Sequence, residues 1–383
     1  MEAMIENNML KWAVGRAQIS IDTLSSKLSV KREKIEKWLS GEAKPTFRQA
    51  QTLAKKLHIP FGYLFLSEPP KEEIPFPDFR TIKNQPTYHQ SAYLMELLYD
   101  LERKQQWYRE YLIENGYERL SFVGSASMDT PTEVLAKEIT SHFGMDALKR
   151  RVRKREDFIY ELTRQVEAIG IVVLRSSYAG TGTQNSIKVE ELRGLAIADD
   201  YAPFIFINSA DSNNAQVFTL MHELAHIWLG QSGISDIDLI ADEEKIEKYC
   251  NDVAAEVLLP QVWFRQSWKS EQSIEENLEQ ISKNQFVSQF VVLKRAYDVR
   301  FISFENYRQE YERLMREWEE TKAQRPDGGN YYNSKPAKES RRLSLAIVES
   351  ALEGKMLYRD ALDLLNIKSM KTFNEFAKNL GVA

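Results

Sequence analysis

The chain has 383 residues, 43% of them hydrophobic and 28% charged, which is ordinary for a globular protein of two or three domains. Its apolar runs are shorter than a membrane span, and its acidic N-terminus lacks the basic-then-apolar order of a signal peptide. The single cysteine, Cys250, excludes an intramolecular disulfide and a multi-cysteine zinc site, and it predicts a reducing, cytoplasmic location.

The net charge of -5 is unevenly distributed along the chain. Residues 1–66 carry 11 Lys and Arg against 6 Asp and Glu, a net charge of +5, whereas the remainder carries 40 against 50, a net charge of -10. A basic segment ahead of an acidic body predicts that the N-terminal part meets phosphates. The alternative is that this charge only keeps the surface soluble.

Residues 1–66 predict a compact group of short helices. An apolar stripe predicts a helix that ends near Leu28, and a second helix is expected over residues 31–39, with Gly41 ending it. Pro45 and Thr46 then open a further helix.

This order of helix, short turn and helix resembles the Xre/Cro-type helix-turn-helix, most recognisably over residues 38–46. In that family the second helix of the motif enters the major groove of DNA. The resemblance implies DNA contacts by the basic side chains of this helix, which are Lys31, Arg32, Lys34 and Lys37. Because Glu33 and Glu36 lie in the same helix and repel phosphate, the alternative is a helix-turn-helix kept for dimerisation or protein contact.

The rest of the chain divides into three predicted regions. Residues 67–129 form a proline-rich linker and a connecting helix over 91–116, residues 130–322 form a domain, and residues 323–383 form a helical C-terminal module that follows a loop over 323–338. Three short strands are expected, over residues 171–174, 195–198 and 204–208. The basic run 149–155 is expected to be a solvated connector, with a nucleic-acid-binding patch as the alternative. The predicted fold class is therefore mainly α with a small β-sheet (α+β).

Residues 214–230 predict one buried helix that contains His222, Glu223 and His226. Residues four apart lie on the same helical face, so both imidazoles can reach one zinc ion while Glu223 reaches its bound water. Burying these groups without a metal is costly, although a metal-free His–Glu–His hydrogen-bond cluster is the alternative.

A catalytic zinc needs a third protein ligand and an open position for water. A third histidine in the extended motif is excluded, because positions 229 and 232 are Leu and Ser. A carboxylate from a following helix is expected instead. Glu247 and Glu256 both lie at the margins of the apolar face of that helix, and helical phase alone does not choose between them.

The His-Glu-Leu-Ala-His helix, followed by Asn251, the Ala-Ala-Glu of residues 254–256 and the Leu-Leu-Pro of 258–260, resembles the ImmA/IrrE family of metallopeptidases. The resemblance extends to residues 78–81 and 328–333, and members are often fused to an Xre-like domain. It implies a zincin-like, gluzincin-like fold for residues 130–322. It also implies zinc held by His222, His226 and Glu256, with Glu223 as general base.

The function that this resemblance implies is a cytoplasmic regulatory zinc endopeptidase that cleaves a partner protein, commonly a transcriptional repressor, in a stress response. The fused domain would bring it to DNA, as a homodimer in many Xre-like proteins. The alternative is a DNA-binding regulator or antitoxin-like protein whose zinc domain is a sensor. A hydrogen-bond donor that stabilises the oxyanion of the tetrahedral intermediate is also needed. Tyr249, His142 and His89 are the candidates, and the sequence does not choose between them.

Overall fold

The computed structural model describes residues 2–17, 19–70, 75–76, 91–180, 185–235, 245–323 and 340–382. They form two compact units. The first holds the chain up to Pro75, the first part of α5 to Glu102, and Tyr178–Ile187, while the second holds Arg103–Ser177 and the chain from Lys188 onward. Most of the predicted linker between residues 71 and 90, with His89, and the predicted loop over 324–338 lie outside the described residues, as do the segments 78–81 and 328–333.

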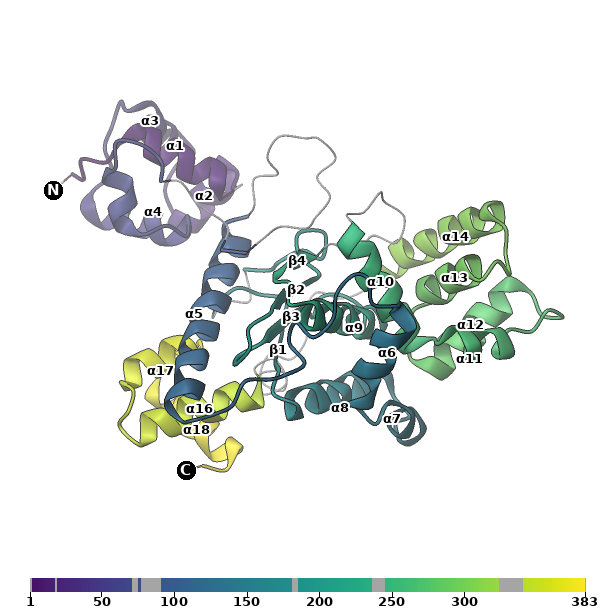
Figure 1. Cartoon of the computed structure of the whole chain (residues 1–383). Coiled ribbons are helices and arrows are strands. Elements are labelled where there is room, and N and C mark those ends of the chain that lie inside the picture. The colour runs from purple at the N-terminus through teal and green to yellow at the C-terminus, as the bar shows by residue number, and fades with distance from the viewer. Residues whose placement is uncertain are drawn as a thin grey trace. The chain divides into compact units, whose positions relative to one another are not determined.

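The first unit is all-helical. Its elements are α1 (Asn7–Arg16), α2 (Ile21–Leu28), α3 (Arg32–Ser40), α4 (Phe47–Lys56), the 3-10 helix η1 (Phe61–Phe65) and the start of α5 (Ala92–Glu114), as Figure 1 shows. Ser29 takes a left-handed conformation with φ 54° between α2 and α3, and Gly41 ends α3 with φ 87°. Thr46 and Gln49 form a capping box that starts α4. The predicted helix, turn and helix are confirmed.

The second unit contains a mixed four-stranded sheet in the order β1-β3-β2-β4. The strands are β1 (Val172–Ser176), β2 (Gly194–Ile197), β3 (Phe204–Asn208) and β4 (Gly233–Ser235). β1 pairs with β3 in parallel, with Val172 opposite Phe204, whereas β2 pairs antiparallel with both β3 and β4. The three predicted strands are confirmed; β4 was missed because three residues carry too little alternation to be recognised.

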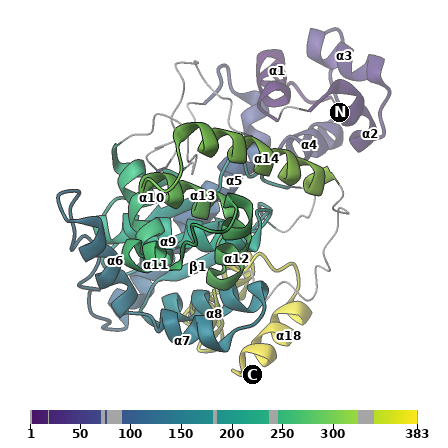
Figure 2. The same cartoon turned by 90° about the vertical axis from the view of Figure 1, so that its right-hand side faces the viewer.

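Two helices pack on this sheet, and two others follow in further layers (Figures 1 and 2). α9 (Asn213–Leu229) packs on β2 and β3, α10 (Lys245–Leu258) packs on α9, and α6 (Thr132–Ser141) packs on α10. α8 (Arg155–Ala168) contacts both β1 and α9. α9 is therefore covered on several sides, which explains why its sequence is apolar nearly all round.

Two helical groups complete the unit. One holds α11 (Gln261–Ser267), α12 (Ile274–Gln285), α13 (Gln289–Asp298) and α14 (Phe304–Ala323), and Figure 2 shows α14 lying across α13. The other, yellow in Figure 1, holds α16 (Arg341–Leu352), α17 (Tyr358–Leu364) and α18 (Met370–Leu380), with α16 in contact with both of the others. The predicted fold class, mainly α with a small sheet, is confirmed, and none of the described helices is long and apolar enough to cross a bilayer.

The prediction of a solvated connector over 149–155 holds only in part: Arg150, Arg151 and residues 153–155 are exposed, whereas Lys149 is not. α7 spans Met145–Arg151, and the Lys149 ammonium donates to the carbonyl of Leu258 at 3.1 Å and to Gln285 Oε1 at 2.7 Å. Lys149 therefore ties α7 to two other helices instead of standing in a solvated connector.

Candidate metal centre

The helix that carries the motif is closed at both ends by local signals. The Ser212 side chain accepts a hydrogen bond from the Ala215 amide at the N-terminus, and Gly230 ends α9 in a left-handed conformation with φ 67°. Between these caps His222, Glu223 and His226 are fully buried. Polar groups at this depth need partners, so the side chains around them decide what the helix can do.

A carboxylate from α10 meets both histidines. His222 Nε2 lies 3.2 Å from Glu247 Oε2, and His226 Nε2 lies 3.1 Å from Glu247 Oε1. The two histidine Nε2 atoms are 3.1 Å apart. The three donor atoms all lie within 4.8 Å of one another, and no other group of three His, Cys, Asp or Glu side chains in the described part of the chain has this geometry.

The donor set fits a zinc ion. Two imidazole nitrogens and one carboxylate are the ligands of a site with one open position. Asn251 Oδ1 lies 2.9 Å from His222 Nδ1, so Nδ1–H donates to the amide oxygen and the lone pair of Nε2 faces the group. A buried carboxylate beside two imidazole lone pairs is stabilised by a cation placed between them.

The electrostatics favour an ionised carboxylate at this position. Burial on its own would raise the pKa of Glu247, but its hydrogen bonds with His222 and His226 lower that pKa to about 2. Burial likewise opposes the charged form of both histidines; the pKa of His222 is nevertheless raised by Glu247, whereas the pKa of His226 is lowered because burial prevails. Glu247 is thus held in the form that binds metal.

The structure does not bring Glu256 into this group, which corrects the third ligand expected from the resemblance. Glu256 Oε1 accepts a hydrogen bond from the Gln261 amide at 3.0 Å, and its Oε2 lies 3.2 Å from Arg295 Nη2. Both side chains of this ion pair are about nine-tenths buried. Glu256 therefore joins α10 to the following helices, and Glu247, the other residue that helical phase left open, faces the histidines.

Gly194, at the start of β2, keeps space open for the Glu223 carboxylate. A Cβ atom at position 194 would lie 2.2 Å from Glu223 Oε1 and 2.7 Å from Thr219 Cγ2. The sequence analysis missed this residue. The available signal was a glycine in an otherwise apolar strand, which often marks a close approach of backbone to another group.

A cavity of about 700 Å³ adjoins this part of α9. Thr219 lines it and precedes Glu223 by four residues, hence one turn along the same face. Phe218 and Arg193 also line it, and α14 supplies Tyr311 and Trp318. The cavity therefore offers space with an apolar wall along the helix that carries Glu223.

The structure gives other contacts to two of the three oxyanion candidates. The Tyr249 hydroxyl donates to the Thr130 carbonyl at 2.7 Å, and burial raises its pKa to about 12. His142 packs against the rings of Phe122 and Trp228, with centroid distances of 5.6 and 5.4 Å. Neither contact points to a role in stabilising an oxyanion.

The four basic residues expected to contact DNA are all exposed; they are Lys31, Arg32, Lys34 and Lys37. Arg32 is engaged within the unit, since its guanidinium lies 2.9 Å from Asp22 and 2.8 Å from Glu36. The Lys34 ammonium lies 5.7 Å from the centre of the Trp38 ring. The lysines at 31, 34 and 37 are therefore better placed than Arg32 to meet a phosphate.

Two family models match parts of this chain. The peptidase family M78 model, described as the IrrE N-terminal-like domain, matches residues 166–301, which include the sheet, α9 and α10. A domain of unknown function, DUF8813, matches residues 340–379, the segment that contains α16 to α18. Neither match covers residues 1–66, and no curated protein matches the chain. The segment that matches a peptidase family model thus holds the three converging side chains and Glu223.

Proposed function

We propose that this chain is a zinc-dependent regulatory endopeptidase of the cytoplasm whose substrate is another protein. The observation that carries the proposal is the convergence of His222, His226 and Glu247 beside Glu223, inside a segment that matches a peptidase family. Zinc bound there supplies Lewis-acid chemistry, since it lowers the pKa of a water molecule and polarises a peptide carbonyl.

The chain's own residues have distinct roles in this reaction. His222, His226 and Glu247 hold the metal, and Asn251 fixes the ring of His222 through its Nδ1–H. The Glu223 carboxylate accepts the proton of the attacking water and returns it to the nitrogen of the leaving amine. Glu223 can do both because it lies one residue from a ligand and has the space that Gly194 leaves beside it.

The cavity along α9 is the place where we expect the substrate chain to bind. It begins at Thr219, one turn before Glu223, and its wall contains Phe218 and the α14 residues Tyr311 and Trp318. Such a wall suits an apolar side chain next to the scissile bond.

The N-terminal unit supports a link to transcription. Its α3 exposes Lys34 and Lys37, and the N-cap residue Lys31 is exposed beside them, as a DNA-contacting helix requires. We propose that this unit, as a homodimer, binds DNA and that the substrate is a transcriptional repressor in a stress response, as the resemblance to ImmA/IrrE proteins implies.

A metal sensor without peptidase activity is the competing function. A sensor needs the three ligands but has no need of a carboxylate at position 223. The buried Glu223 carboxylate, for which Gly194 leaves room, supports the peptidase, because a sensor would have no use for a carboxylate there.

The test uses zinc-loaded full-length chain, added to a lysate of its host, with new protein N-termini identified by terminal labelling and mass spectrometry. Wild type is compared with Glu223→Gln and, as a matched control, with Glu312→Gln on the exposed side of α14. We expect new N-termini with wild type and the control, and none with Glu223→Gln at full zinc content. Wild type that generates no new N-termini at full zinc occupancy would leave the sensor as the better description.

A further inference from the structure

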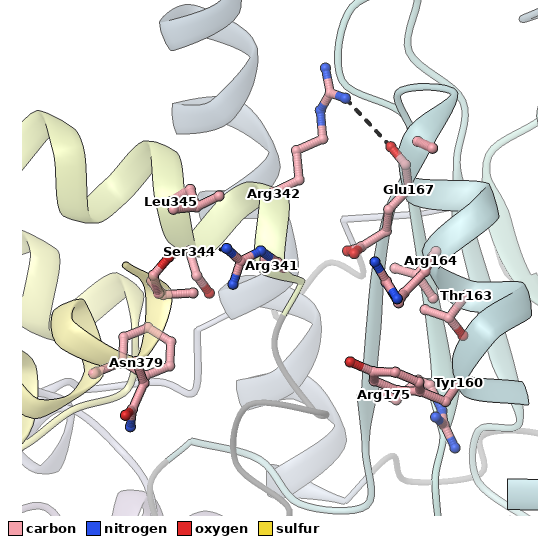
Figure 3. Close-up of a pocket in the computed structure, with 14 residues that line it drawn as sticks. Tyr160, Thr163, Arg164, Glu167, Arg175, Arg341, Arg342, Ser344, Leu345 and Asn379 are labelled. Carbon is pink, nitrogen blue, oxygen red and sulfur yellow. Dashed lines mark hydrogen bonds between the residues drawn. The ribbon is translucent and has the colours of Figure 1, made fainter. Parts of the chain in front are cut away.

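A second cavity, of about 370 Å³, lies within the second unit between the peptidase domain and the C-terminal helices. One wall comes from α8 and β1, and the other comes from α16 and α18 (Figure 3). It lies outside the metal centre, since none of its lining residues is a ligand or Glu223.

The charges that line this cavity are strongly unbalanced. Four arginines contribute to it against one acidic residue, Glu167; they are Arg164, Arg175, Arg341 and Arg342. Figure 3 shows Arg164, on α8, beside the Glu167 carboxylate, and Arg341, on α16, across the cavity beside Ser344. A net charge of +3 around a small cavity attracts an anion.

Three of these guanidinium groups are fixed by oxygen atoms that carry no charge, whereas Arg164 Nη1 lies 3.4 Å from Glu161 Oε1 in an exposed ion pair. Arg342 Nε donates to the Tyr108 hydroxyl at 2.8 Å, Arg341 Nη2 to the Leu380 carbonyl at 3.0 Å, and Arg175 Nη2 to Gln216 Oε1 at 2.7 Å. These bonds orient the guanidinium groups without neutralising them. A phosphate group accepts two parallel hydrogen bonds from one guanidinium group, so it would use the N–H groups that these bonds leave over.

The position of two of the arginines adds to this preference. Arg341 and Arg342 are the first two residues of α16, a helix of 12 residues whose N-terminal end carries partial positive charge. Positively charged side chains at this end destabilise the helix, because the partial charge there has the same sign. An anion that binds both the guanidinium groups and this end of α16 removes that conflict.

The acidic residue points to a second feature of the ligand. Glu167 Oε1 is buried and has no hydrogen-bond partner, whereas the same carboxylate is hydrogen-bonded to the Ser340 side chain and to the Val173 and Arg341 amides. A ligand hydroxyl would donate to this oxygen, because a buried acceptor without a donor is costly. Apolar side chains, including Val173, Leu345 and Phe376, line the rest of the cavity and suit the carbon skeleton of an organic molecule.

We propose that this cavity binds a small organic phosphate that also carries hydroxyl groups, such as a sugar phosphate or a nucleoside monophosphate. Arg164 and Arg341 recognise the phosphate from opposite walls, and Glu167 accepts from a hydroxyl. The ligand thereby joins the peptidase domain to the C-terminal helices. The volume lies within the range of cavities that hold small metabolites.

The test is isothermal titration calorimetry on the full-length chain with four probes: glucose 6-phosphate, adenosine 5′-monophosphate, inorganic phosphate and adenosine. We expect at least one organic phosphate to bind, at least about tenfold more tightly than inorganic phosphate or adenosine. Arg341→Ala and Arg164→Ala, both exposed enough to spare the fold, should each weaken that binding about tenfold or more. Arg308→Ala, on the exposed side of α14, is the matched control and should bind as wild type does.

A second variant tests the hydroxyl contact separately. Glu167→Leu removes the acceptor, and it should remove the advantage of the organic phosphate over inorganic phosphate while inorganic phosphate still binds. Circular dichroism establishes that each variant is folded. Absence of binding by both organic phosphates, binding unchanged in Arg341→Ala and Arg164→Ala, or equal affinity for inorganic phosphate in wild type would each overturn the proposal.

Discussion

Glu247 and Glu256 lie on opposite sides of α10, because nine residues correspond to two and a half helical turns. One carboxylate meets His222 and His226, and the other meets Arg295. The same helix thus supplies a carboxylate to the candidate metal centre on one side and a buried ion pair on the other. Removing the two carboxylates should therefore have different consequences.

Glu256→Ala should keep its zinc and lose stability. Its removal leaves the buried guanidinium of Arg295 without its carboxylate, at a cost of about 3 kcal/mol in the free energy of unfolding. Glu247→Ala, in contrast, should lose zinc. The measurements are zinc per chain by mass spectrometry and chemical denaturation. Zinc lost from a folded Glu256→Ala protein and kept in Glu247→Ala would restore Glu256 as the ligand.

Asn251→Ala should weaken zinc binding by about 10- to 100-fold, because the hydrogen bond that orients the His222 ring is lost. Asn251→Asp keeps an oxygen acceptor at the same place and serves as the matched control, with affinity near that of wild type. Competition with a chelator of known affinity measures the effect. Equal affinities for wild type and Asn251→Ala would show that the 2.9 Å contact does not support the ligand.

Gly194→Ala should reduce peptidase activity by about 100-fold while zinc stays bound. The added methyl would stand 2.2 Å from Glu223 Oε1, so the carboxylate has to move. Gly144→Ala, where the nearest atom is 3.9 Å from the added methyl, is the control. Rates are compared on the substrate found by terminal labelling. Full activity in Gly194→Ala would separate this glycine from the function of Glu223.

Glu167→Gln should change how stability depends on pH. Burial is the main reason that the pKa of Glu167 is raised above its ordinary value of 4.5. The folded state then binds its proton more tightly than the unfolded state, so this residue's contribution is fully present below pH 4.5 and is lost as pH rises through the raised pKa. The variant should lose less stability than wild type over that rise. Melting temperatures of both proteins from pH 4 to pH 7 measure it, and parallel curves would contradict the assignment.

Replacing Lys31 and Lys37 together by Ala should weaken binding to duplex DNA and reduce its salt dependence. Each lysine that contacts a phosphate contributes about 1 to the slope of log affinity against log salt. Arg32→Ala should have a smaller effect, because Arg32 is already paired with Asp22 and Glu36. Fluorescence anisotropy at several salt concentrations provides the slopes. DNA binding unchanged in the double variant would favour dimerisation or protein contact for this unit.

Short-range patterns were sufficient to predict much of this molecule. The capped helix around His222, Glu223 and His226 follows from residues within one segment, and so do the strand Phe204–Asn208 and the helix Tyr358–Leu364, both predicted with the bounds that the structure has. Elements with weak local signals, such as α7 and β4, were not recognised.

The sequence by itself determined that two imidazoles and a carboxylate lie on adjoining positions of one buried helix, because the spacing of four residues and the helical rise leave no other arrangement. Only the tertiary structure decided which carboxylate lies with the two histidines. The side of α10 that faces α9 depends on how the two helices pack, and both Glu247 and Glu256 are compatible with its apolar pattern. The clearance at Gly194 and the arginine-lined cavity have the same origin, since each brings together segments far apart in the chain, whose contact depends on packing and not on local sequence.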